Sequence, residues 1–181
     1  TLRVRGADYP VPPELVDRTM HGWEGLWPGL TGMLLVGMAS VFLVWLNDTE
    51  GFQLSRYLQA LGYAVAGGLV WSGMWAFSNR LFGRHARLGR HLFIVGCALA
   101  AMVLFRVGAS IVAYAWSIEW LVRYGSHVMI ALAAGMVYFH LRTVKPQQRR
   151  LFATSCLILA ALGSGLTVIG NLQRSGSAAD Q

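Results

Sequence analysis

Two histidines are the residues whose types and spacing come closest to a cofactor site. His91 lies near the start of the third of five long apolar segments, and His140 lies near the end of the fourth. If these segments are antiparallel helices, the two imidazoles face each other, as axial haem ligands do. His127 precedes His140 by 13 residues, but no second histidine follows His91 in the third segment to complete a second site. Histidines beside basic loops more often contact water or lipid, so we expect no cofactor and keep haem ligation by His91 and His140 as an alternative.

Arg106 is a single charge inside an otherwise apolar segment. A cation at the middle of a membrane helix costs about 2.5–3.5 kcal/mol on insertion scales, so it usually faces a partner or water. It lies 14 residues after Leu92, about 21 Å along a helix axis, which lets its side chain extend to the outer surface. Pairing of Arg106 with an acid such as Glu119 would indicate an ion or substrate site. Arg106 and Glu119 are therefore the candidate intramembrane polar residues.

No arrangement of residues matches a catalytic or metal site. Gly163-Ser164-Gly165 is similar to the serine motif of intramembrane proteases, but Leu162 stands where that motif needs glycine. No base is paired with Ser164 in the sequence pattern. His21 and His85 lie outside the apolar segments and form no cluster with metal-ligand spacing. The sequence predicts no enzymatic activity and no bound metal.

The composition places these residues in a membrane. Of 181 residues, 55% are hydrophobic and only 13% are charged, which excludes an ordinary soluble domain and a disordered chain. Five apolar stretches have the length of about 17–25 residues that a helix needs to cross a bilayer. They cover residues 29–46, 58–77, 92–116, 120–141 and 151–172. The predicted fold is all-α: an integral membrane bundle of five transmembrane helices with a short extended N-terminal segment.

The basic residues alternate between loops. Eight of them lie in the two loops after the second and fourth segments, which contain no acid: Arg80, Arg84, Arg87, Arg90, Arg142, Lys145, Arg149 and Arg150. The loops after the first and third segments hold Asp48, Glu50 and Glu119. Because basic loops stay in the cytoplasm, we expect a cytoplasmic N-terminus and a periplasmic C-terminus in a bacterial inner membrane. The eight basic residues serve topology or bind lipid headgroups, and no nucleic-acid partner is expected.

The N-terminal segment resembles part of a known domain. Residues 1–14, TLRVRGADYPVPPE, look like the closing strand and linker of a forkhead-associated (FHA) domain. Residues 71–92, WSGMWAFSNRLFGRHARLGRHL, and 138–142, YFHLR, look like the membrane region that follows such domains in some bacterial proteins. The resemblance implies a cytoplasmic module that binds phosphothreonine peptides, whose binding residues would precede Thr1. It divides the chain into a remnant strand and linker (1–12), an interfacial lead-in (13–28), the membrane domain (29–172) and a polar tail (173–181).

These observations predict a membrane anchor or signal-coupling domain that tethers a phosphopeptide-recognition module to the inner membrane. The alternatives are a small transporter or channel component that uses Arg106, and a haem-binding redox subunit. The expected partners are the lipid bilayer and, through the upstream module, a phosphoprotein. A second copy of the chain is a further expected partner, because small residues recur every four positions in the second segment (Ala60, Ala64, Gly68, Ser72).

Overall fold

The computed structural model describes residues 25–82 and 86–179, with side chains described as far as residue 173. Within these ranges the chain is helical and contains no strand. The elements are α1 (Leu26–Asn47), α2 (Leu54–Phe82), α3 (Leu88–Trp116), α4 (Glu119–Arg123), α5 (Gly125–Val144), the 3-10 turn η2 (Pro146–Gln148) and α6 (Arg149–Ala179). The all-α prediction is confirmed, whereas the predicted extended segment at the N-terminus lies outside the described residues.

Five of these helices, α1, α2, α3, α5 and α6, are long and apolar enough to cross a membrane. The prediction of five transmembrane helices is therefore confirmed. Most of their large apolar side chains are exposed on the surface of the bundle. In a lipid environment such a surface needs no covering, because acyl chains are as apolar as leucine.

The observed helix ends differ from the predicted ones for physical reasons. α1 begins three residues early, at Leu26, because Pro28 in its first turn needs no backbone donor there. α2 and α3 extend past the apolar stretches into polar residues, since helical hydrogen bonds continue beyond the hydrocarbon. α6 continues to Ala179 where a polar tail was predicted, because no proline interrupts its backbone hydrogen bonds.

The predicted fourth segment is two helices. After α3, Ser117 takes a left-handed conformation (φ 54°) and reverses the chain, and α4 follows as five residues carrying Glu119 and Arg123. Tyr124 separates α4 from α5 at the point where the chain turns back into the bundle. A single helix from residue 120 was wrong, because the turn after α3 needs a change of direction that an unbroken helix does not allow.

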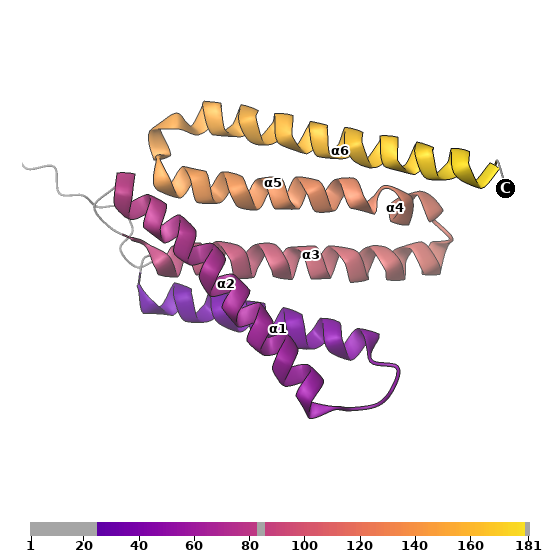
Figure 1. The fold of residues 1–181 in the computed structure, drawn as a ribbon, viewed down its shortest axis with the longest axis horizontal. Helices are drawn as coiled ribbons and strands as arrows, with labels where there is room; N and C mark the ends of the chain where they lie inside the picture. Colours follow the sequence, from indigo (N-terminus) through magenta and orange to yellow (C-terminus); the bar gives the residue numbers. More distant parts are fainter. Residues whose placement is uncertain (1–24, 83–85, 180–181) are drawn as a thin grey trace, which may run out of the picture.

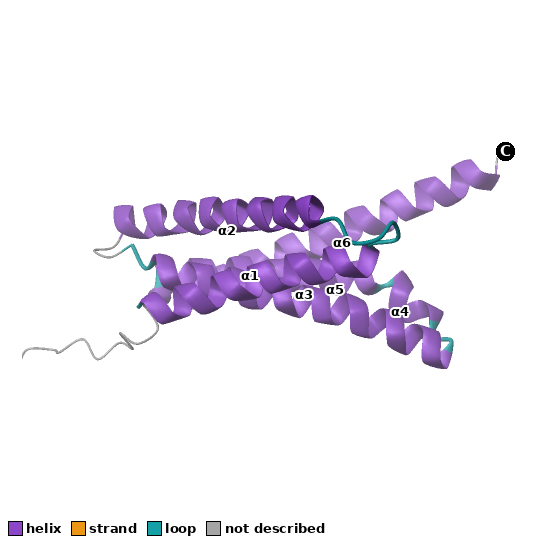
Figure 2. Ribbon diagram, turned by 90° about the horizontal axis from the view of Figure 1, so that it is seen from below, coloured by secondary structure: helices purple, strands orange, loops and turns teal. Residues whose placement is uncertain are grey.

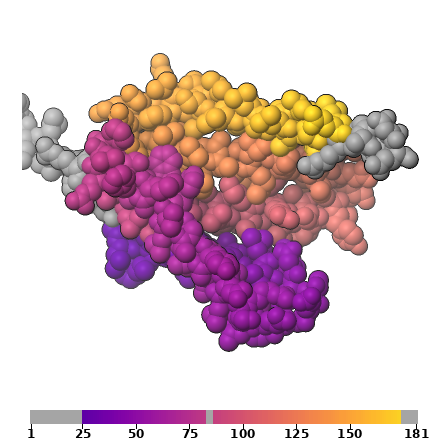
Figure 3. Space-filling view, viewed as in Figure 1, coloured from indigo at the N-terminus to yellow at the C-terminus, as the bar shows by residue number. Residues whose placement is uncertain are grey.

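Successive long helices run in opposite directions, so the ends that carry the basic loops meet on one side of the bundle (Figure 1). α3, α5 and α6 lie side by side, and α2 crosses α1 and α3 at an angle, with its C-terminal end near α5 (Figures 1 and 2). The space-filling view shows α2 in front of α1 and α3, with α6 along the outer edge of α5 (Figure 3). Figure 2 shows α6 diverging from the other helices toward its C-terminal end.

α1 packs on α3 through glycines. A Cβ atom at Gly32 would overlap the backbone of Leu92 and Phe93, and one at Gly96 would overlap the backbone of Gly32. A Cβ atom at Gly29 would lie 3.2 Å from the Cα of Gly89. The two helix backbones are thus in direct contact, which glycine alone among the residues permits at this spacing.

Candidate functional site

The structure brings His91 and His140 together inside the bundle. His91 is in the first turns of α3 and His140 is near the end of α5, and the antiparallel directions of α3 and α5 place both at the same level. Both side chains are 0% exposed, which makes them the most deeply buried large side chains of the described residues. Buried ionisable residues within a membrane domain usually mark a functional site. The expectation that histidines beside basic loops would contact water or lipid was wrong for these two.

A hydrogen bond connects the two imidazoles. The Nδ1 atoms of His91 and His140 lie 2.8 Å apart, so one of them donates and the other accepts. The indole Nε1–H of Trp71 donates to Nε2 of His140 at 3.2 Å. A neutral His140 that accepts at Nε2 carries its proton on Nδ1, from which it donates to Nδ1 of His91. The chain of donors therefore runs from Trp71 through His140 to His91, whose own proton is on Nε2.

Stacked rings enclose this hydrogen bond. Trp75 of α2 stacks on His140, with ring centroids 4.9 Å apart and an interplanar angle of 5°. The rings of His91 and His140 are stacked at 5.1 Å, and Trp71 meets Trp75 edge-on at 6.3 Å. We call Trp71, Trp75, His91 and His140 the Trp–His cluster. The ring contacts of this cluster connect three helices, α2, α3 and α5, at the end of the bundle that carries the basic loops.

Four buried polar atoms, two of them in the Trp–His cluster, have no hydrogen-bond partner among the described residues. They are Ser72 Oγ, Trp75 Nε1, Asn79 Nδ2 and His91 Nε2. Residues 72, 75 and 79 occupy one face of α2, because they are spaced by three and four positions. An unsatisfied buried donor costs about 1–3 kcal/mol, so packing stability alone does not favour this set.

The two Nδ1 atoms form a direct hydrogen bond, and this arrangement leaves no room for a metal ion between these two nitrogens. Two metal–histidine bonds of about 2 Å on opposite sides of a metal place their nitrogens about 4 Å apart, whereas Nδ1 of His91 and Nδ1 of His140 are 2.8 Å apart. No group of three or more His, Cys, Asp or Glu side chains that could hold a metal occurs in the described part of the chain. Haem ligation by His91 and His140 stays a prediction.

The structure does not bring Arg106 and Glu119 together. Arg106 is exposed on α3 and, within residues 25–82 and 86–173, makes no ion pair. It lines a cavity of about 340 Å³ with Ser110 and Ser126. Glu119 is exposed and lines a different cavity, beside Arg123. Asp48 and Glu50 each lie 2.8 Å from Arg56, across the α1–α2 loop.

Seven of the eight loop cations lie at the end of the bundle that holds the Trp–His cluster. Lys145 links two of the helix ends there, because its Nζ lies over the ring of Phe82 at 5.1 Å. Arg84 falls among residues that the structure does not describe. The others are at the end of α2 (Arg80), the start of α3 (Arg87, Arg90), the end of α5 (Arg142, Lys145) and the start of α6 (Arg149, Arg150).

Sequence reasoning missed the contribution of α2 to this site. Ser72 was assigned to a stripe of small packing residues, and the tryptophans of α2 were not connected with the histidines. The available signal was the spacing of Ser72, Trp75 and Asn79, which places three polar groups on one helical face. No protein-family model, curated protein or solved structure matches the chain.

Proposed function

We propose that this chain is a membrane-anchored signal-coupling domain, in which the Trp–His cluster connects a movement of α1 to α5 and its basic loop. In this proposal the domain lies in a bacterial inner membrane, with the N-terminal segment and both basic loops in the cytoplasm. The five membrane-length helices and the collection of cations at one end support this placement.

The observation that carries the proposal is the position of the α1–α3 glycine contact. Gly32 of α1 lies against the backbone of Leu92, the residue next to His91. No side chain separates the two backbones. Because no side chain can rotate to accommodate a shift of α1, such a shift also moves the turn of α3 that contains Leu92. The turn carries one partner of the His91–His140 hydrogen bond, and the other partner is on α5. α1 also directly follows the N-terminal segment along the chain.

A simple anchor does not account for the cluster. Anchoring needs only apolar helices, and the exposed surfaces of α1, α2, α3, α5 and α6 already provide these. The four buried polar atoms that have no partner among the described residues lower stability instead. A hydrogen bond between two helices has two discrete states, made or broken, which is the property that a coupling element requires.

The cytoplasmic input of this domain is proposed from the FHA resemblance of residues 1–14. An FHA module ahead of α1 would bind a phosphothreonine peptide and transmit the change to α1. The coding sequence ahead of Thr1 tests this part, since it should contain a complete FHA fold. An unrelated fold there would refute the proposed phosphopeptide input. The proposed coupling between α1 and α5 would remain and is tested by a separate experiment.

A double-mutant cycle tests the coupling. Unfolding free energies are measured on the purified chain in mixed micelles for Gly32→Ala, His140→Phe and the double variant. Residues that act through one network show interaction energies of about 0.5–3 kcal/mol, and we expect a value in this range. The control is Gly108→Ala combined with His140→Phe, because a Cβ atom at Gly108 meets nothing within 4 Å. Additivity of the Gly32 and His140 substitutions, like that expected for the control pair, would show that α1 and the cluster are independent.

A further inference from the structure

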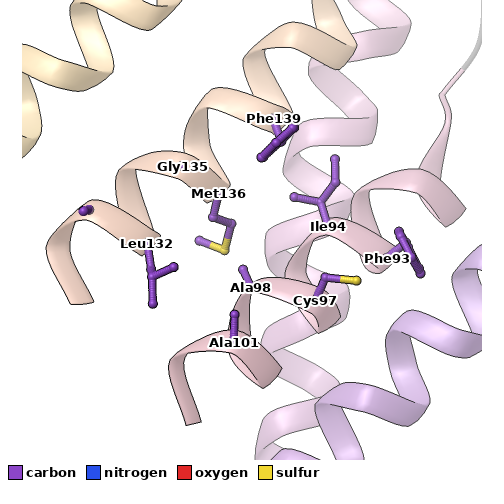
Figure 4. Close-up of a pocket in the computed structure, with 10 residues that line it drawn as sticks. Phe93, Ile94, Cys97, Ala98, Ala101, Leu132, Gly135, Met136 and Phe139 are labelled. Carbon is purple, nitrogen blue, oxygen red and sulfur yellow. The ribbon is translucent and has the colours of Figure 1, made fainter. Parts of the chain in front are cut away.

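An apolar groove runs between α3 and α5 on the surface of the bundle. Its volume is about 370 Å³, and its lining is entirely apolar apart from the thiol of Cys97. Ile94 and Ala98 of α3 lie opposite Met136 of α5 across the groove, and Phe139 stands at one end (Figure 4). The space exists because Ala101 and other small residues line the middle of the groove.

The groove has the shape and chemistry of a site for an acyl chain. Its lining offers almost no hydrogen-bonding group, so an occupant with polar atoms would lose their hydration without compensation. It follows the axes of two membrane-spanning helices, which is also the mean direction of lipid chains. From Ile94 to Ala101 it extends seven residues, or about 10 Å along the helix axis. Sites of about 300–1,000 Å³ are typical for bound small molecules, and this volume lies within that range.

Two arginines, Arg90 and Arg142, follow the groove-lining faces of α3 and α5 beyond the end of the groove that Phe139 marks. Arg90 precedes Ile94 by four residues and Cys97 by seven, which places it on the groove face of α3. Arg142 follows Phe139 by three residues and Gly135 by seven, which places it on the groove face of α5. Both side chains are half-buried. Guanidinium groups bind phosphate oxygens with two parallel hydrogen bonds, so this end suits a phosphate.

We propose that this groove binds one anionic phospholipid, with an acyl chain between α3 and α5 and the phosphate between Arg90 and Arg142. The basis is the combination of a hydrocarbon-lined groove with two cations at the end of the bundle where the basic loops place the headgroup layer. Arg149 and Arg150 are at the same end, but they are on α6 and line no part of this groove. The proposal does not depend on the signal-coupling function.

Native mass spectrometry of the purified full chain tests the site. The chain is titrated in detergent with phosphatidylglycerol and with phosphatidylcholine of the same acyl chains. We expect one phosphatidylglycerol to be retained more tightly than phosphatidylcholine. Each basic residue near a headgroup contributes about 1 kcal/mol, so the double substitution Arg90→Gln/Arg142→Gln should weaken phosphatidylglycerol binding about 30-fold. The matched control, Arg149→Gln/Arg150→Gln, removes the same charge and should change the affinity less than two-fold.

A second pair of variants tests the groove itself. Ala98→Phe fills the middle of the groove and should abolish retention of both lipids. Ala101→Leu, a smaller change, serves the same purpose if Ala98→Phe does not fold, with helix content checked by circular dichroism. Equal losses in the two arginine pairs would show only general attraction of anionic lipid to the basic end and would overturn the proposal. Unchanged lipid retention in a folded groove variant would also overturn it.

Discussion

His140 is the central residue of the site because both of its ring nitrogens have partners. Its Nε2 accepts a hydrogen bond from Trp71, and its Nδ1–H donates one to Nδ1 of His91. Trp75 covers its face at a centroid distance of 4.9 Å. A hydrogen bond inside a low-dielectric environment is stronger than in water, and the loss of one partner leaves the other buried and unsatisfied. Substitution of His140 should therefore lower the free energy of unfolding more than substitution of either partner.

Substitution of this residue should reveal the hydrogen-bond chain. His140→Phe retains an aromatic ring but leaves the Trp71 Nε1–H and the Nδ1 atom of His91 without partners. We expect the free energy of unfolding to fall by about 2–4 kcal/mol, measured in mixed micelles. The control is His127→Phe on the same helix, where the imidazole is only half-buried and a change within about 0.5 kcal/mol is expected. If the two substitutions lowered the free energy of unfolding equally, the hydrogen bonds from Trp71 through His140 to His91 would not have the proposed stabilising role.

Arg106 stands out in the sequence but makes no ion pair with the described part of the chain. The sequence left two explanations open, an ion-paired site and a side chain that extends to the membrane surface. Within the described helices its guanidinium is exposed and makes no ion pair with Glu119 or the acids of the α1–α2 loop. A long side chain that keeps its charge near the surface while its stem lies in lipid accounts for these features.

At the level of helices, small residues determine how closely the elements approach. The stripe of small residues in α2 packs within the chain: a Cβ atom at Gly68 would contact Val36 of α1 at 3.7 Å, and Ser72 is fully buried. A homodimer through this part of the stripe would need these contacts to open. The glycines between α1 and α3 permit an even closer approach, because backbone meets backbone there.

Gly32→Ala should separate α1 from α3. Its added methyl group would overlap the backbone of Leu92, which cannot rotate away as a side chain can. Overpacking of this kind typically costs about 1–3 kcal/mol, and we expect a loss of this size in unfolding free energy. Gly108→Ala places its methyl group in open space and should be neutral or stabilising by up to about 1 kcal/mol, since alanine is the better helix former. A Gly32→Ala variant as stable as Gly108→Ala would refute the tight contact.

At the level of the whole molecule, the two ends of the bundle differ in charge. One end collects the basic residues of two loops, and the other holds the network in which Arg56 binds Asp48 and Glu50. The ion pairs neutralise most of the charge in the α1–α2 loop, so that loop opposes translocation less than the cation-rich loops do. This difference in charge predicts that the basic end of the bundle faces the cytoplasm.

Reporter fusions in bacteria test this orientation. Green fluorescent protein fused ahead of Thr1 should fluoresce, because it folds in the cytoplasm. Alkaline phosphatase should be active when fused after Gly51 or Gln181 and inactive when fused after Gln147. The opposite pattern would mean that the basic loops face the periplasm, and the cytoplasmic input of the proposed function would then have to be given up.

The sequence by itself determined the five membrane helices and their approximate positions. Backbone amides in hydrocarbon must be satisfied within their own segment, so length and apolarity are sufficient to predict a helix. The short α4 and the exact helix ends were not predictable in the same way. They depend on where the chain must turn and on how far helical hydrogen bonds continue into the polar region.

Only the tertiary structure decided which contacts the two histidines make. The sequence indicated that His91 and His140 could face each other, but their direct hydrogen bond depends on the rotation of α3 and α5 about their axes. The addition of Trp71 and Trp75 depends on α2 crossing α3 and reaching α5 (Figure 1). Crossing angles and rotations arise from contacts between residues far apart in the chain, such as Gly32 against Leu92, and no local pattern of residues contains them.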